Sequence, residues 1–352
     1  MHDGSVGNQS SPRRVLRAVA PIRICDNGGW TDTWFADHGR VFNIAVTPSV
    51  EVKVSLWPLG AQGDRVTLYL NDADGSCSLG AEAVHRHSPL IGATVDEIGV
   101  PRDVSAEITI SSEVPPGSST GTSAAVSVAL IAALDALTPG RMTRHEIAMT
   151  AHRVEVDRLG LQSGVQDQLC AAYGGVNYIE VPAYPEATVT QIPFSDEVRG
   201  ELERRLVLVL LGRTHVSSDV HERVIDALAG EGPDSPLLVA LRQAADDARD
   251  AASAADFAAL GWAMTANTEL QRQLHPDLIS DEAQMVIDTA AGLGASGWKV
   301  NGAGGEGGSV TILTGPEKEA RGRLGSALVQ ADPSFRLVPT TLSREGVRVW
   351  DE

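Results

Sequence analysis

The segment EVPPGSSTGTSAA at residues 113–125 leads from a predicted strand into a predicted helix through a loop of glycines and hydroxyl residues. Glycines let the backbone come close to a ligand, and the unpaired N–H groups at a helix N-terminus attract anions. The loop is therefore a candidate phosphate site, although a Ser- and Thr-rich turn before a capped helix has the same composition. It is not a Walker loop, because Gly117 and Gly121 are separated by three residues and no lysine follows.

Hydrophobic periodicity on both sides of this loop predicts an α+β protein. Apolar and polar residues alternate over 50–56 and 104–110, which is typical of half-buried strands. The Ala- and Leu-rich run 119–137 predicts a mostly buried helix, and a second helix is expected over 144–159. Further strands are expected at 206–211, 309–313, 335–338 and 347–350, and further helices between 236 and 270 and over 282–293.

The chain of 352 residues is long enough for two ordinary domains. A polar segment covers 183–203, with Pro185 and Pro193 inside it and Pro182 just before it, and separates the two predicted halves. We expect a flexible arm at 1–14, an N-terminal domain at 15–190 and a C-terminal domain at 191–352.

The net charge and the distribution of apolar residues indicate which kinds of binding partner to expect. The formal net charge is −18, which repels nucleic acid and anionic membranes, so a small molecule is the expected partner. No apolar run is long enough to cross a membrane and the first residues lack a secretory signal, which predicts a cytoplasmic protein. The three cysteines show no CxxC spacing, so neither a disulfide framework nor a zinc site is expected.

Two acidic residues follow the phosphate loop at a spacing that suits metal-assisted phosphoryl transfer. Glu155 lies in the second predicted helix, and Asp167 follows the glycine-containing loop 159–164. One carboxylate can hold Mg²⁺ against phosphate oxygens, and the other can orient or deprotonate an attacking hydroxyl. Taken singly, Glu155 would be read as a surface residue and Asp167 as a helix cap.

Two more segments carry polar chemistry. The segment PIRICDNGGWTD at 21–32 offers carboxylates, an amide and an indole, which suits a polyhydroxylated ligand as well as a hydrogen-bonded turn. The segment VNGAGGEGGS at 300–309 holds five glycines in seven residues and leads into a strand. Because so much glycine is costly in backbone entropy, we expect this loop to approach a ligand or the first loop closely.

Together these motifs resemble the GHMP kinase superfamily over nearly the whole chain. The three family motifs correspond to residues 20–32, 115–125 and 302–307. Residues 164–180, 210–222 and 294–305 look like the heptose 7-phosphate kinase and fucokinase branch. Two departures from the family pattern are Ser119-Thr120, where Gly-Leu is usual, and Glu306, where another glycine is usual and where a carboxylate would repel a triphosphate unless it faces away or helps hold metal.

The resemblance implies an N-terminal domain like the second domain of ribosomal protein S5, a ferredoxin-like C-terminal domain, and ATP with Mg²⁺ between them. It implies that Asp167 is the catalytic acid or base and that Ser123 and Glu155 hold Mg²⁺. The implied ATP-binding residues are Pro116, Gly117, Ser118, Ser119, Thr120, Gly121, Thr122, Ser123, Gly304 and Gly305. The implied substrate-binding residues are Arg23, Asn27, Trp30, Asp32, Gly302 and His215.

The expected activity is transfer of the ATP γ-phosphoryl group to a sugar hydroxyl, with the anomeric hydroxyl preferred. A sugar phosphate or a small alcohol remains an alternative acceptor, and a catalytically silent nucleotide or sugar binder is the alternative outside enzymes. The sequence leaves open the sugar, the hydroxyl and whether the chain forms a homodimer.

Overall fold

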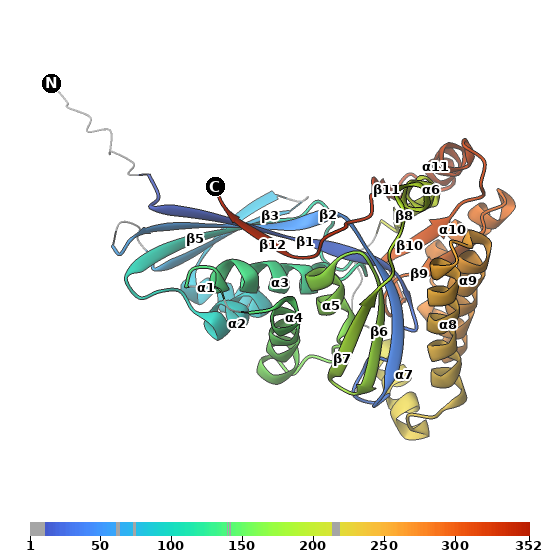
Figure 1. The fold of residues 1–352 in the computed structure, drawn as a ribbon, viewed down its shortest axis with the longest axis horizontal. Coiled ribbons are helices and arrows are strands. Elements are labelled where there is room, and N and C mark those ends of the chain that lie inside the picture. The colour runs from blue at the N-terminus through green and yellow to red at the C-terminus, as the bar shows by residue number, and fades with distance from the viewer. Residues whose placement is uncertain (1–10, 61–63, 73–74, 139, 141, 213–218) are drawn as a thin grey trace.

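The computed structural model describes residues 11–352 except 61–63, 73–74, 139, 141 and 213–218. It has a long mixed sheet at the N-terminal end and a four-stranded sheet at the C-terminal end (Figure 1). This arrangement confirms the predicted two-domain α+β fold.

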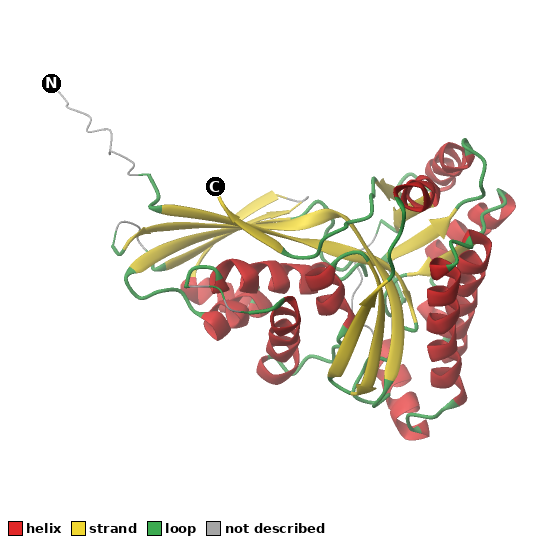
Figure 2. Ribbon diagram, in the orientation of Figure 1, coloured by secondary structure: helices red, strands yellow, loops and turns green. Residues whose placement is uncertain are grey.

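The first sheet has the strand order β12-β1-β2-β5-β3-β4, with β6 paired to β2 and β7 paired to β6. Its strands are β1 (Arg14–Asn27), β2 (Gly39–Pro58), β3 (Val66–Asp72), β4 (Gly75–Gly80), β5 (Val104–Ser111), β6 (Val176–Ala183), β7 (Glu186–Gln191) and β12 (Arg348–Asp351). Figure 2 shows helices gathered on one face of this sheet. They are α1 (Ala81–His87), α2 (Pro89–Ile98), α3 (Thr122–Asp135), α4 (Arg144–Arg153), the π-helical turn η1 (Val154–Arg158) and α5 (Gln166–Tyr173).

Helix α3 is the central helix of this layer. Most of its residues are buried, Ser123 in the first turn being exposed, as expected for a helix without a continuous polar face. The prediction began this helix at residue 119, but it begins at Thr122 because Ser119 and Gly121 have φ values of +56° and +67°. Its first turn therefore faces the open loop and not a preceding turn of helix.

The second sheet is antiparallel with the order β11-β8-β10-β9, made of β8 (Leu206–Leu210), β9 (Gly297–Val300), β10 (Ser309–Leu313) and β11 (Arg336–Val338). Numbered within the sheet, this is the 4-1-3-2 order of a ferredoxin-like domain, which confirms that expectation. The helices of this half are α6 (Asp196–Arg205), α7 (Asp219–Glu231), α8 (Pro236–Ser253), α9 (Phe257–Leu274), η2 (Pro276–Leu278), α10 (Asp281–Gly292) and α11 (Ala320–Ala331).

Strand β8 explains why the run at 206–211 is apolar without alternation. Val207 and Val209 pack with α10 and α11, whereas Leu206, Leu208 and Leu210 pack with α8, α9 and the end of the first sheet. A strand covered on both faces needs apolar residues at every position. The core that contains Leu206, Leu208 and Leu210 includes residues of both sheets and holds the two sheets together.

The structure differs from the prediction at the end of the N-terminal arm and at the division between the two domains. Arg14, assigned to the flexible arm, is the first residue of β1 and forms an ion pair with Asp351. The predicted division at 190/191 falls within β7, one residue before its end at Gln191, and β12 returns to pair with β1 in the first sheet. The segment 191–352 is therefore not confined to the second sheet.

Within the described residues, no helix has the length and apolar character needed to cross a membrane.

Candidate active site

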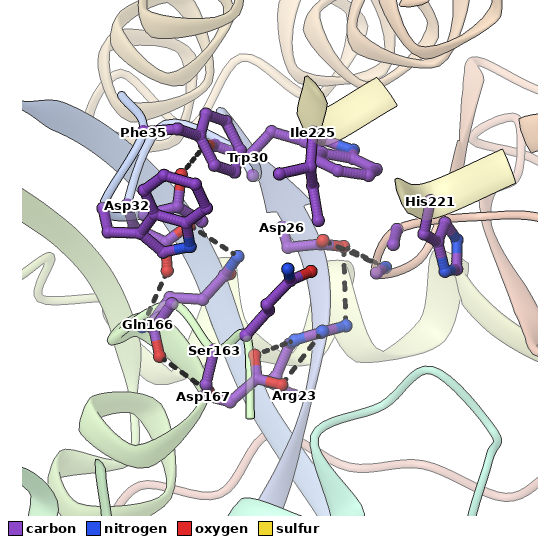
Figure 3. Close-up of a pocket in the computed structure, with 17 residues that line it drawn as sticks. Arg23, Asp26, Trp30, Asp32, Phe35, Ser163, Gln166, Asp167, His221 and Ile225 are labelled. Atoms are coloured by element: carbon purple, nitrogen blue, oxygen red, sulfur yellow. Dashed lines mark hydrogen bonds and ion pairs between the residues drawn. The ribbon is translucent and has the colours of Figure 1, made fainter. Parts of the chain in front are cut away.

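Two neighbouring cavities lie where the two sheets meet. The first, here called the acceptor cavity, is lined by residues of the β1 end, the 162–167 segment and α7 (Figure 3). The second, called the phosphate-loop cavity, is lined by residues 117–124 together with Glu155 and Gln168. Both cavities are lined by Arg23, Asp167, Gly302 and Ala303. The acceptor cavity measures about 260 Å³, close to the lower end of the usual range for small-molecule sites, so it suits a small ligand.

The phosphate loop is held from both sides. The Arg23 N–H donates to the carbonyl of Thr120 at 2.9 Å, and the Ser309 hydroxyl donates to the carbonyl of Ser118 at 2.7 Å. The loop then enters α3, whose first N–H groups have no partner within the helix. The exposed Ser123 lies in this first turn and lines the cavity. Backbone donors, a helix N-terminus and hydroxyls therefore converge on one space, as an anion site requires.

Asp167 is bound by Arg23. The Arg23 Nε and a terminal nitrogen donate to the two carboxylate oxygens of Asp167 at 2.7 and 3.2 Å, and the other terminal nitrogen donates to the carbonyl of Ser119 at 2.6 Å. Burial opposes the charge of Arg23, but the carboxylates of Asp167 and Asp26 outweigh it and raise its pKa. The guanidinium therefore stays charged and holds Asp167 at the wall between the cavities.

Glu155 lies in the π-helical turn that follows α4, a conformation often found at functional sites. Its Oε2 accepts hydrogen bonds from the Ser163 hydroxyl at 2.6 Å and from Gln168 Nε2 at 2.9 Å. Its Oε1 is buried without a partner, although the residue lines the phosphate-loop cavity. Burial raises the pKa of Glu155 to about 7, against the lowering effect of those two hydrogen bonds.

These features fit Mg²⁺. A hard cation with oxygen ligands would satisfy the unpartnered carboxylate oxygen of Glu155, and the exposed hydroxyl of Ser123 lines the same cavity. Among the described residues there is no group of three or more His, Cys, Asp and Glu side chains placed to hold a metal. This is compatible with Mg²⁺, which is usually held by one or two carboxylates together with phosphate oxygens and water.

The acceptor cavity combines carboxylates with aromatic rings. Asp32 is buried, and its carboxylate accepts the backbone N–H of Gln166 at 3.0 Å. Trp30 lies edge-on to His221 with ring centroids 5.9 Å apart and is tilted against Phe35 at 6.4 Å. An acceptor beside aromatic faces suits a sugar, whose hydroxyls need fixed partners and whose C–H face packs on rings.

Asp32 has a predictable effect on stability. Burial, opposed by the Gln166 N–H, raises the pKa of Asp32 to about 6 from 3.8. An acid whose pKa is raised in the fold destabilises it once ionised, so the penalty is absent near pH 4, grows with pH and is complete above about pH 6. Two pKa units correspond to about 3 kcal/mol, as an order of magnitude.

We therefore expect Asp32→Asn to raise the melting temperature at pH 8 and to have little effect at pH 4. The Gln166 amide can turn its unpartnered Oε1 toward the new amide, in exchange for the long contact of 3.4 Å that its Nε2 makes with Asp32. The same variant should raise KM for the sugar, because a charged acceptor is lost. Melting curves across pH 4–8 and sugar saturation curves test both effects. The assignment would be wrong if the difference in melting temperature between the variant and the wild type were less favourable to the variant at pH 8 than at pH 4.

Comparison with known proteins agrees with this geometry. The family model described as "GHMP kinases N terminal domain" matches residues 86–175, which include the phosphate loop, Glu155 and Asp167. The chain contains a GHMP kinase N-terminal domain. Its fold is also that of a solved D-glycero-D-manno-heptose 1-phosphate kinase from Bacteroides thetaiotaomicron, with a TM-score of 0.71, 21% identity and coverage of 95% of this chain and 98% of that one.

Two curated relatives of this chain are sugar kinases by name. D-glycero-alpha-D-manno-heptose 7-phosphate kinase of Campylobacter jejuni is 28% identical over 313 residues, covering 87% of this chain and 91% of that protein. Bifunctional fucokinase/GDP-fucose pyrophosphorylase of Arabidopsis thaliana is 25% identical over 342 residues, covering 89% of this chain and 31% of that longer protein. The resemblance to the heptose kinase and fucokinase branch is confirmed.

The third glycine-rich loop approaches the phosphate loop, as expected. A Cβ on Gly302 would lie 3.0 Å from Ser119 Cβ, and one on Gly308 would lie 2.6 Å from Ser119 Oγ. Gly304 and Gly305, expected at ATP, pack instead against the backbone of Leu278 and line neither cavity. Glu306 is exposed and lines neither cavity.

The remaining predicted residues divide into two groups. Trp30, Asp32, Arg23 and Gly302 all line the acceptor cavity. Asn27 is fully buried and lines neither cavity, so it is not retained as a substrate ligand. His215 lies outside the described residues.

Several residues at the site were missed by the sequence reasoning. Ser163 and Gln168 support Glu155, and both stand in the segment already singled out for its two acids. His221 lines the acceptor cavity and contacts Trp30. Lys299 is a lysine within an apolar strand, a pattern that could have drawn attention to it.

Proposed function

We propose that this protein is an ATP-dependent sugar kinase that phosphorylates a hydroxyl of a free sugar. The observation that carries the proposal is the wall shared by the two cavities: Asp167 and Arg23 line both. ATP phosphates at the helix α3 N-terminus and a sugar beside Trp30 and Asp32 would meet at Asp167.

In this proposal the protein acts mainly by positioning and charge stabilisation. The sugar oxygen attacks the γ-phosphorus, the bond from that phosphorus to the β,γ-bridging oxygen breaks, and ADP leaves. The proton of the sugar hydroxyl passes to a carboxylate oxygen of Asp167, which Arg23 holds in place. When bound by Glu155 and Ser123, Mg²⁺ would neutralise charge on the phosphate oxygens.

Charge in the acceptor cavity favours a sugar without a phosphate group. Three carboxylates line it, those of Asp26, Asp32 and Asp167. Arg23 is the one arginine or lysine among its described lining residues, and its guanidinium is already bound to Asp167. A phosphorylated sugar would bring further negative charge to these carboxylates, which is unfavourable in a buried site. The Campylobacter jejuni relative is named for a sugar phosphate, so both kinds of acceptor belong in the test.

The test is ADP release with ATP, Mg²⁺ and a panel of hexoses, 6-deoxyhexoses, uronic acids and heptoses, each neutral sugar paired with its phosphate where one is available. Phosphorus NMR of the product identifies the hydroxyl, for which we propose the anomeric one. A preference for the phosphorylated member of each pair would overturn the free-sugar proposal. ATP binding without turnover on any acceptor would overturn the kinase proposal and favour a silent binder.

A further inference from the structure

A buried carboxylate, that of Asp26, contacts Arg23 and Gly302, two of the four residues that line both cavities. Asp26, at the end of β1, is 1% exposed. Both of its carboxylate oxygens lie 3.0 Å from the backbone nitrogen of Gly302, which donates to them, and one lies 3.6 Å from a terminal nitrogen of Arg23 (Figure 3). Asp26 therefore contacts the arginine that holds Asp167 and also the glycine loop that closes the phosphate site.

Lys299 reaches the same carboxylate from the second sheet. It lies on β9, is 1% exposed, and its Nζ is 3.5 Å from Asp26 Oδ1. The Nζ also donates to Gln271 Oε1 at 2.9 Å, and Gln271 Nε2 donates to the carbonyl of Gly302 at 2.9 Å. Lys299, Gln271, Gly302 and Asp26 thus form a closed ring of polar contacts that fixes Gly302 at both its N–H and its carbonyl.

The charges of this group balance. Arg23 and Lys299 face Asp26 and Asp167, two cations against two anions. Burial lowers the pKa of Lys299, and Asp26 opposes that effect. Buried ion pairs contribute little net stability compared with apolar residues, so stability alone does not account for this group. Its geometric effect is to tie β1 of the first sheet to the loop after β9 of the second.

We infer that Asp26 and Lys299 are positioning residues that fix Arg23 and Gly302 relative to each other, and through Arg23 the catalytic carboxylate of Asp167. The inference rests on the proposed kinase function and adds two residues to it. Lys299 lines neither cavity, and Asp26 lines the acceptor cavity alone. In this inference both act by holding Arg23 and Gly302, which line the two cavities.

The first test is Asp26→Asn. The amide keeps the shape and can still accept from Gly302, but it loses the charge that anchors Arg23. We expect kcat to fall roughly 100-fold, the size of effect that a misplacement of about 1 Å produces. KM for ATP should stay within about threefold of wild type, because the phosphate loop itself is untouched. A kcat within threefold of wild type would overturn the inference.

The second test separates positioning from stability. Lys299→Met should lower the melting temperature, because it leaves Asp26 with an uncompensated buried charge. The double variant D26N/K299M removes both charges, so its melting temperature should recover. Its kcat should stay at the level of Asp26→Asn, because Arg23 still lacks its anchor. If kcat recovered together with the melting temperature, the pair would be merely structural and the inference wrong.

Asp246→Asn is the matched control. Asp246 is half-buried and joins α8 to the first sheet through Arg40 at 2.6 Å and the Tyr178 hydroxyl at 2.5 Å, but it lines neither cavity. This variant should lose stability and keep its kcat. Sugar-dependent turnover of the wild-type protein tests the proposed function separately.

A second readout needs no turnover. Amide hydrogen exchange over 301–308 should rise severalfold in Asp26→Asn while exchange over β8 stays unchanged. Equal exchange over 301–308 in variant and wild type would overturn the inference even if no sugar were phosphorylated.

Discussion

Asp167→Asn is expected to lower kcat by roughly 10²- to 10⁴-fold, the range that general acid–base groups contribute. The amide keeps the volume and can still accept from Arg23, but it cannot take the proton of the attacking hydroxyl. KM for ATP should change little, because the phosphate loop and the first turn of α3 are unaltered. Steady-state kinetics at saturating sugar and ATP measure both quantities.

A matched control is Asp196→Asn. Asp196 is also a carboxylate paired with an arginine, Arg344, but it is exposed and lies outside both cavities. Its substitution should leave kcat unchanged. If the Asp167 variant retained its turnover, Asp167 would be removed from the mechanism and Arg23 would lose its proposed role.

Glu155→Gln should have the second largest effect, a loss of roughly 10²- to 10³-fold in turnover at low Mg²⁺. The amide keeps the hydrogen-bonding shape but removes the charge that would hold the cation. Charge stabilisation by a bound metal is worth several kcal/mol, which sets this scale. Titrating Mg²⁺ at fixed ATP should show that the variant requires far more metal than the wild type.

The raised pKa of Glu155 adds a pH signature. With its pKa near 7 in the absence of metal, the side chain is neutral below that pH and must lose a proton to bind a cation. The apparent Mg²⁺ requirement of the wild type should therefore increase about tenfold per pH unit below 7, and Glu155→Gln should lack this dependence. Asp157→Asn, an exposed carboxylate on the same π-helical turn, is the control and should behave as wild type. A wild-type requirement that did not change between pH 6 and 8 would contradict the assignment.

Much of the fold could be predicted because its signals are local. The alternation over 50–56 and 104–110 marks β2 and β5, and the apolar run at 206–211 marks β8. The return of β12 to the first sheet had no local signal. Its residues read as a strand, but its partner β1 lies at the other end of the sequence, and pairing over such a separation is decided by tertiary packing.

The site was predictable to the extent that its chemistry lies in short motifs. The phosphate loop, Glu155 and Asp167 were found because residue type and spacing point to phosphate and metal. The position of Arg23 was not, because 144 residues separate it from the carboxylate that it binds. Asn27 was predicted as a substrate ligand because it stands among polar residues in the 21–32 segment. Successive side chains of a strand point in different directions, so Asn27 is buried away from both cavities although its neighbours line one of them.

The return of β12 to β1 also has a consequence for synthesis. The part of β1 that pairs with β12 ends at Val19, and β12 begins at Arg348. At roughly 5–20 residues per second, a ribosome takes on the order of 15–65 s to cover that interval. Throughout it, the edge of β1 at Leu16–Val19 lacks the partner that it has in the fold, and an unpaired strand edge is a known route to aggregation. The nascent chain should therefore depend on chaperones until its last strand emerges.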